Sequence, residues 1–107
     1  MVEKKTLSDL QKQVDKWISQ YGGGYWDPLS MLAALIEECG ELAKEINYQQ
    51  GYKPKKSKER DHNIKEELAD VLFALICIAN YYKIDLEEEL EKTLHKFTTR
   101  DGKRFNE

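Results

Sequence analysis

The clearest structural signal in this chain is EELADVLFALICIAN, residues 66–80, which is apolar at nearly every position from 71 to 79. Its apolar side chains recur at spacings of three and four, as they do in an α-helix. A helix that is apolar all round has to be surrounded by protein. Asn63 and Glu66 have the spacing of an N-cap and its capping-box acid. We therefore expect a central helix from about Asn63 to Tyr82.

Two further helices are predicted before this one. The first follows Thr6, which forms a capping-box pattern with Asp9, and it ends at the glycine run 22–24. The second opens at Asp27-Pro28, because proline is favoured in the first turn of a helix, and it breaks near Gly51. Both carry an apolar stripe at helical spacing, so each has a face to bury.

The rest of the chain is predicted to form a basic loop, a fourth helix and a basic tail. Residues 50–62 are rich in lysine and contain a proline, which is typical of a loop. The fourth helix should begin at Asp85, with Glu88 in the capping-box position, and reach about Phe97. The basic tail follows at 98–107. These elements predict an all-α bundle of about four helices per chain, which we expect dimerisation to complete.

Composition indicates one cytoplasmic domain spanning residues 1–107. The 17 basic and 20 acidic side chains give a net charge of −3, which argues against binding to a nucleic-acid polymer. Cys39 and Cys77 have the pattern of reduced, buried thiols. No stretch approaches the roughly 20 apolar residues of a membrane span, and the N-terminus lacks the apolar run of a secretory signal.

Two acid pairs border the apolar stripes of the second and third helices, Glu38 with Glu41 and Glu67 with Asp70. Residues three apart lie on one face of a helix, so the pairs converge if the two helices pack side by side. Four carboxylates beside a core repel one another unless a cation neutralises them. Oxygen ligands without histidine or thiol favour Mg²⁺, or Mn²⁺ in its place. The sequence therefore predicts a magnesium site between two helices.

Small residues stand beside these acids. Ala34 lies between Glu38 and Glu41 on the helix surface, and Ala74 lies one turn beyond Asp70. Alanine side chains leave space where larger ones would fill it. We therefore expect a cavity at this place that can hold an ion or a phosphate.

A solvated acidic surface is the competing explanation, because acid pairs three apart also arise by chance, as at Glu88 and Glu91. We assign Glu45 and Glu66 to surface or capping roles and leave Glu37 open. No histidine follows either glutamate motif by three residues, which argues against the Glu-x-x-His pattern of di-iron bundles.

Two aromatic positions have different expected roles. Trp17 falls on the apolar stripe of the first helix, and we expect it in the core. Tyr25-Trp26 lies at a bend next to the glycine run. It either packs on the second helix or offers a face on which a nucleobase stacks.

Glu-Glu-x-x-Glu at 37–41 followed by Glu-x-x-Asp at 67–70 on the next helix resembles the signature of MazG-type nucleotide pyrophosphohydrolases. The resemblance covers nearly the whole chain and includes GGGYWDPLSMLAALIEECGELAKEINY (22–48), GYKPKK (51–56), EELADVLFALICIAN (66–80) and HKFTTRDGKRF (95–105). It implies an all-α, MazG-like fold whose protomers pair into dimers or tetramers. It also implies hydrolysis of a nucleoside triphosphate to the monophosphate and pyrophosphate with Mg²⁺.

The resemblance also implies roles for individual residues. The metal ligands would be Glu38, Glu41, Glu67 and Asp70. Glu37, with Glu38 beside it, would be the catalytic position that orients or deprotonates the attacking water. Substrate contacts would come from Lys53, Lys55, Lys56, Asn80, Lys96 and Arg100. Independently of the resemblance, the aromatic bend gives Trp26 as a further substrate contact, next to the base. If all these basic groups reach one site, a partner protomer supplies some of them, and the site is shared.

Two function classes follow from the sequence. One is a Mg²⁺-dependent nucleoside triphosphate pyrophosphohydrolase, with a housekeeping role in the nucleotide pool. The other is a non-catalytic helical dimer that binds a nucleotide or a protein. Substitution of Glu38 or Asp70 separates them, because only the enzyme would lose turnover.

Overall fold

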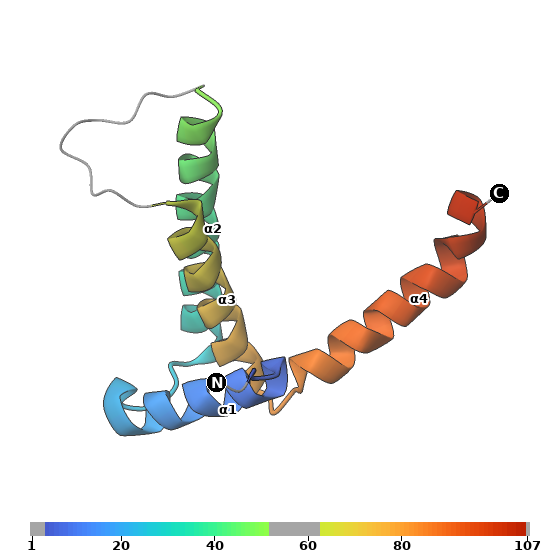
Figure 1. The fold of residues 1–107 in the computed structure, drawn as a ribbon. Coiled ribbons are helices and arrows are strands. Elements are labelled where there is room, and N and C mark those ends of the chain that lie inside the picture. Colours follow the sequence, from blue (N-terminus) through green and yellow to red (C-terminus); the bar gives the residue numbers. More distant parts are fainter. Residues whose placement is uncertain (1–3, 52–62, 107) are drawn as a thin grey trace.

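The computed structural model describes residues 4–51 and 63–106, with side chains described as far as residue 100. The described residues form α1 (Leu7–Trp17), a π-helical turn η1 (Ile18–Gly22), α2 (Pro28–Gln49), α3 (Ile64–Tyr81) and α4 (Leu86–Asn106), and they contain no strand. Figure 1 shows α2 and α3 side by side as an antiparallel hairpin, with α1 across one end of it. The predicted all-α fold of four helices is confirmed.

The predicted helix starts are present as hydrogen-bonded caps. Thr6 and Asp9 form a reciprocal capping box at α1, with both bonds at 3.0 Å. Asp27 accepts the Ser30 N–H at 3.1 Å at the start of α2, where Pro28 occupies the first turn. The side chain of Asn63 likewise accepts an N–H from the first turn of α3. These caps satisfy N–H groups that the helix itself leaves without a partner.

Two helix ends differ from the prediction. The first α-helix stops at Trp17 and continues as the π-helical turn η1, whose wider coil rotates the residues that follow relative to an α-helix. The fourth helix does not end near Phe97 but runs to Asn106, so residues 98–106 of the expected tail are helical. No proline interrupts this segment, and its single glycine is tolerated within a helix at a modest cost.

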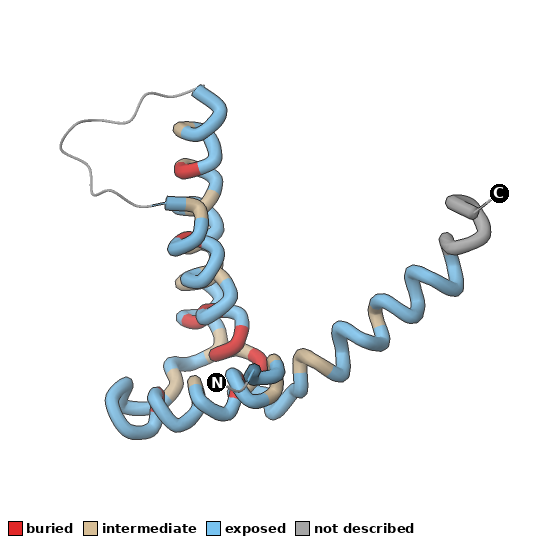
Figure 2. The backbone as a smooth tube through the Cα atoms, in the orientation of Figure 1, coloured by how far each residue is buried: buried red, intermediate tan, exposed pale blue. Residues whose placement is uncertain are grey.

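The apolar core lies where α1, α2 and α3 meet. Ile18, Met31 and Cys77 are its buried members, and Val14, Tyr25 and Ile78 pack around them. Figure 2 shows the buried positions on the α2–α3 hairpin and at its junction with α1, whereas α4 is exposed along most of its length. No helix in the described part of the chain combines the length and apolar character needed to cross a membrane.

A buried amide links α1 to the connection between α3 and α4. The side chain of Gln11 is 6% exposed. Its Nε2 donates to Asn80 Oδ1 at 3.0 Å and to the Ile84 carbonyl at 2.9 Å, while its Oε1 accepts the Leu86 N–H at 2.8 Å. Asn80 Nδ2 in turn donates to the Gln11 carbonyl at 2.9 Å. This network fixes the direction in which α4 leaves the hairpin.

Replacing Gln11 by Leu should therefore destabilise the fold by about 2 kcal/mol or more, because three polar groups lose a buried hydrogen bond. Urea unfolding of the variant measures this free energy. Gln13→Leu is the matched control. Its side chain is exposed and accepts a hydrogen bond from Lys5 Nζ, so we expect a change within about 0.5 kcal/mol. Equal effects of the two substitutions would contradict the assigned role of Gln11.

Candidate active site

Three of the four predicted ligand carboxylates meet between α2 and α3. Glu38 on α2 and Glu67 and Asp70 on α3 each offer a carboxylate oxygen, and these oxygens lie within 4.8 Å of one another. Two oxygens bound to one Mg²⁺ are at most about 4.2 Å apart, twice the metal–oxygen bond. Small side-chain shifts would therefore let all three bind one ion. The donor set consists of carboxylate oxygens alone, which fits Mg²⁺ or Mn²⁺.

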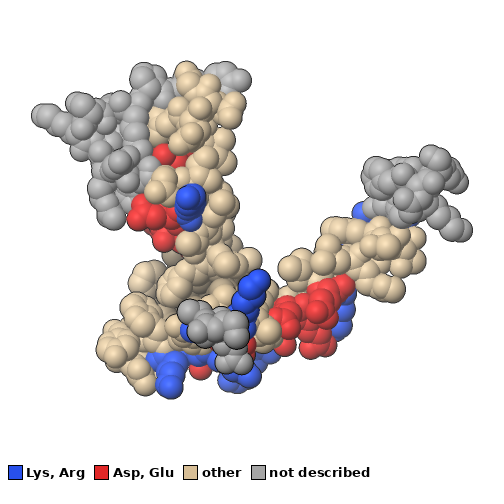
Figure 3. Space-filling view, in the orientation of Figure 1, with Lys and Arg blue, Asp and Glu red and all other residues tan. Residues whose placement is uncertain are grey.

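The electrostatics of this cluster favour a cation. Glu67 is only 2% exposed and Glu38 is partly buried. The pKa of Glu38 is raised, first because burial desolvates the carboxylate, and then because the charges of Asp70, Glu67, Glu41 and Glu37 oppose its ionisation. Figure 3 shows acidic side chains gathered on the α2–α3 hairpin, apart from those on the first part of α4.

The other acids of the motif lie around this cluster. Glu41 and Glu37 are exposed on α2, outside the group of three, but close enough for their charges to raise the pKa of Glu38. Glu45 is buried, at 5% exposed, so the prediction of a surface or capping role was wrong. Its position beyond the apolar arc of α2 did not predict this burial.

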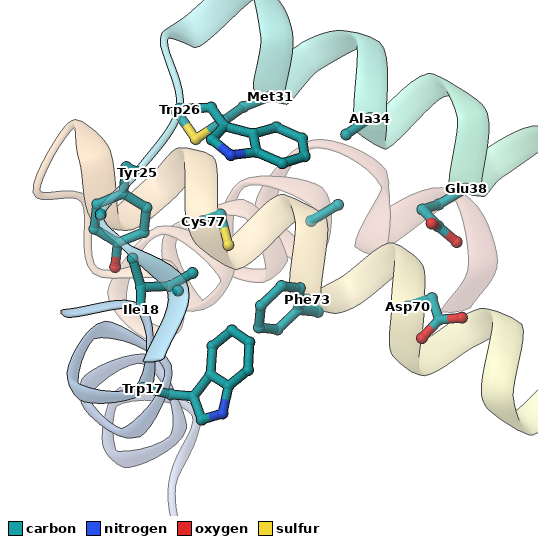
Figure 4. Close-up of a pocket in the computed structure, with 13 residues that line it drawn as sticks. Trp17, Ile18, Tyr25, Trp26, Met31, Ala34, Glu38, Asp70, Phe73 and Cys77 are labelled. Atoms are coloured by element: carbon teal, nitrogen blue, oxygen red, sulfur yellow. The ribbon is translucent and has the colours of Figure 1, made fainter. Parts of the chain in front are cut away.

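A cavity of about 450 Å³ extends from the carboxylates toward α1, and Glu38 and Asp70 line one end of it. Figure 4 shows these two carboxylates facing each other across the gap between α2 and α3. Ala34 and Ala74 line the cavity next to them, which confirms that the small residues leave space there. The volume lies within the roughly 300–1,000 Å³ that is typical of small-molecule sites.

The opposite end of the cavity is aromatic and apolar. Its lining comes from η1 and its neighbours and from facing residues of α2 and α3, namely Trp17, Ile18, Gly22, Gly24, Tyr25, Trp26, Met31, Phe73 and Cys77. Burial raises the pKa of the Cys77 thiol, so that group is uncharged. Burial, together with a 2.7 Å hydrogen bond to Asp15, raises the pKa of Tyr25 to about 12. The charge of the cavity is therefore concentrated at its carboxylate end.

Trp17 is not the core residue that its helical spacing predicted. Its side chain is 49% exposed and forms part of the cavity wall, with its ring in an edge contact to Phe73 at a centroid distance of 5.9 Å. The sequence interpretation missed Phe73 as a site residue because it lies within the apolar run of α3. Its position one turn from Asp70 on that helix is the signal that could have identified it.

The predicted substrate contacts fall into four groups. Trp26 lines the cavity and is 62% exposed. Asn80 does not line it; its Nδ2 donates to the Gln11 carbonyl and to the Tyr25 hydroxyl. Lys96 and Arg100 lie on α4, next to the Phe97 ring, and Figure 1 shows α4 pointing away from the hairpin. The three loop lysines, Lys53, Lys55 and Lys56, lie outside the described residues.

Known proteins resemble this chain over most of its length. The family model of the MazG nucleotide pyrophosphohydrolase domain matches residues 27–105. YpjD of Bacillus subtilis strain 168 is 50% identical over 101 residues, which span 94% of this chain and 91% of YpjD. YvdC of the same organism is 27% identical over 100 residues, which span 88% of this chain and 94% of YvdC.

Two solved structures are also similar. The crystal structure of YpjD, described there as a candidate pyrophosphatase, matches with a TM-score of 0.79 and 49% identity over 90% of this chain and 98% of its own. A Bacillus-conserved MazG protein, described as a nucleotide pyrophosphohydrolase, matches with a TM-score of 0.77 and 47% identity. The match covers 94% of this chain and 97% of that protein. The family model covers most of the chain and YpjD is half identical over nearly its whole length, so the chain belongs to the MazG nucleotide pyrophosphohydrolase family, whose members are hydrolases of phosphorus anhydrides.

Proposed function

We propose that this protein hydrolyses nucleoside triphosphates, ribo or deoxy, to the monophosphate and pyrophosphate with the aid of Mg²⁺. The observation that carries the proposal is the two-ended cavity, with Glu38 and Asp70 at one end and an aromatic wall at the other. A nucleotide has the same division, since its base is a flat aromatic ring and its phosphates bind divalent cations. The base would lie at the aromatic end, next to Trp26, and the phosphates at the carboxylates.

The metal would be held by the cluster of Glu38, Glu67 and Asp70, completed by Glu41 from the neighbouring turn of α2. Bound there, Mg²⁺, or Mn²⁺ in its place, would offset the negative charge of the phosphate oxygens and lower the pKa of a bound water. Glu37 and Glu38 are adjacent on α2, and Glu38 lines the cavity. We assign to this pair the orientation and deprotonation of the attacking water.

The phosphates also need cations from the protein, and within one chain the described α4 carries Lys96 and Arg100 away from the cavity. Leu90, Leu94 and Phe97 on α4 are each between 45% and 55% exposed, and several large side chains of α3 are between 40% and 53% exposed. Such an apolar row is favourable only when covered. We propose that a second copy covers it, that the active unit is a dimer or tetramer, and that the site is shared between protomers.

The proposed activity is tested by incubating the protein with each nucleoside and deoxynucleoside triphosphate and Mg²⁺, and identifying the products. We expect a monophosphate and pyrophosphate in equal amounts. ¹⁸O-labelled water would show which phosphorus is attacked, by the product that carries the label. Absence of pyrophosphate from every nucleotide, with either Mg²⁺ or Mn²⁺, would contradict the proposal. A role in clearing surplus or aberrant nucleotides from the cell would follow from the substrates that are preferred.

A further inference from the structure

The π-helical turn η1 directly follows Trp17 and brings Gly22 against its side chain. The Ile18 carbonyl accepts the N–H groups of both Gly23 and Gly24, the latter at 3.1 Å, which closes the turn. Gly23 and Gly24 have φ values of 75° and 98°, a left-handed backbone that favours glycine. The turn thereby ends immediately after Gly22 and brings this residue over the side chains of Trp17 and Ile18.

Gly22 is required for space rather than for backbone conformation, because it is not among the residues with positive φ. A Cβ atom at this position would lie 3.2 Å from Ile18 Cδ1 and 3.4 Å from Trp17 Cζ3. Ile18 is buried, so it has little freedom to yield, whereas the half-exposed indole of Trp17 can shift. Both Gly22 and Trp17 line the cavity, so a methyl group at Gly22 would reduce the room available at the aromatic end.

The aromatic end offers few side-chain groups that could recognise a base by hydrogen bonding. Tyr25 lines the cavity, but its hydroxyl already donates to Asp15 at 2.7 Å and accepts from Asn80 at 3.0 Å. The remaining described side chains there are indoles, a phenyl ring, a thiol, a thioether and an alkyl group. Such a wall discriminates by stacking and by volume, since every base presents a π-face.

We propose that Trp17 is a specificity-determining residue, a wall whose position Gly22 sets and which limits the size of the nucleobase that the cavity accepts. The proposal rests on the proposed function, because it assigns the aromatic end of the same site to the base. It predicts opposite effects from two substitutions. Trp17→Phe enlarges the cavity and should favour purines, whereas Gly22→Ala narrows it and should favour pyrimidines.

The test measures kcat/KM for purine and pyrimidine triphosphates with the full-length protein and both variants. One methylene in a binding pocket changes discrimination by roughly 10- to 200-fold. We expect the ratio of kcat/KM for purine over pyrimidine triphosphates to change by about 10-fold. This is the low end of that range, because Trp17 and Gly22 are both exposed to solvent. The ratio should rise for Trp17→Phe and fall for Gly22→Ala.

Two controls separate this role from general damage to the fold. Inorganic tripolyphosphate has no base, so its inhibition constant as a competitor should be the same for the wild type and both variants. Gly40→Ala is the matched glycine substitution, because a Cβ at that position meets nothing within 4 Å and the residue does not line the cavity. It should leave the purine-to-pyrimidine ratio unchanged.

The outcomes distinguish the two proposals. If the wild type releases no pyrophosphate from any triphosphate, the proposed function is wrong and this inference with it. If the wild type is active but the ratio stays constant, or moves in the same direction in both variants, only the role of Trp17 and Gly22 is wrong. A parallel rise in the inhibition constant of tripolyphosphate would likewise overturn it, because the effect would then not act through the base.

Discussion

Replacing Asp70 by Asn, or Glu38 by Gln, should lower the turnover of nucleoside triphosphates by about 100-fold or more. Each change removes a charged oxygen from the group of three whose oxygens lie within 4.8 Å of one another. A neutral amide binds Mg²⁺ more weakly than a carboxylate does and cannot offset its charge. The rate of pyrophosphate release measures the effect directly.

The same substitutions should have opposite effects on stability with and without metal. The pKa of Glu38 is higher in the folded protein than in the unfolded chain. The folded state therefore loses stability as the pH rises from the unfolded pKa through the folded pKa, because Glu38 must then ionise at an unfavourable site. Near neutral pH without metal, Glu38→Gln should therefore raise the melting temperature, because it relieves the repulsion by Asp70 and Glu67. The increase in melting temperature that Mg²⁺ gives the wild type should be lost in the variant.

Glu91→Gln is the matched control for these measurements. It removes one negative charge from an exposed acid on α4, outside the cluster. It should change neither the response to Mg²⁺ nor turnover by more than about twofold, because an exposed charge is screened by solvent. A metal response that survives both Glu38→Gln and Asp70→Asn would show that the ion binds somewhere else.

The α2–α3 hairpin that holds the acids could be predicted from the sequence. Its capping residues and its apolar spacing both indicate the same two helices. Asp27 and Asn63 begin α2 and α3 as their cap spacing indicated. The i, i+3 spacing of Glu67 and Asp70 placed both on the face that meets α2. The four-helix count and the acidic site thus follow from caps and periodicity, which depend on residues close together in the sequence.

The features that the sequence did not predict depend on geometry that helical periodicity does not describe. An α-helical projection assigns Trp17 to the core, but its side chain lies in the cavity wall, where the π-helical turn that follows places Gly22 against it. Glu45 lies at the edge of its helix, where burial is decided by what packs over that edge. Helix α4 continues past Phe97 because no proline interrupts it. Residues 98–106 are mostly polar, so they have no apolar stripe from which a helix could be predicted.

The second large effect is expected at the apolar face of α4. Leu94→Glu should convert the assembly to monomers, because it places a charge in the middle of the exposed row formed with Leu90 and Phe97. Light scattering measures the mass in solution. His95→Glu adds the same charge on another side of the helix and should leave the mass unchanged. Turnover should fall with the mass if Lys96 and Arg100 act on the partner's cavity.

Mixing two variants of reduced activity tests the shared site itself. Glu38→Gln destroys the acidic half of a site, and Arg100→Ala weakens its proposed basic half. In a mixed dimer the intact acids of one chain would meet the intact arginine of the other. Random exchange between equal amounts of the two should therefore restore about one quarter of wild-type activity, since half of the dimers are mixed and each holds one complete site. Activity that stays at the average of the two parents after exchange would place the whole site within one chain, and α4 would then only hold the protomers together.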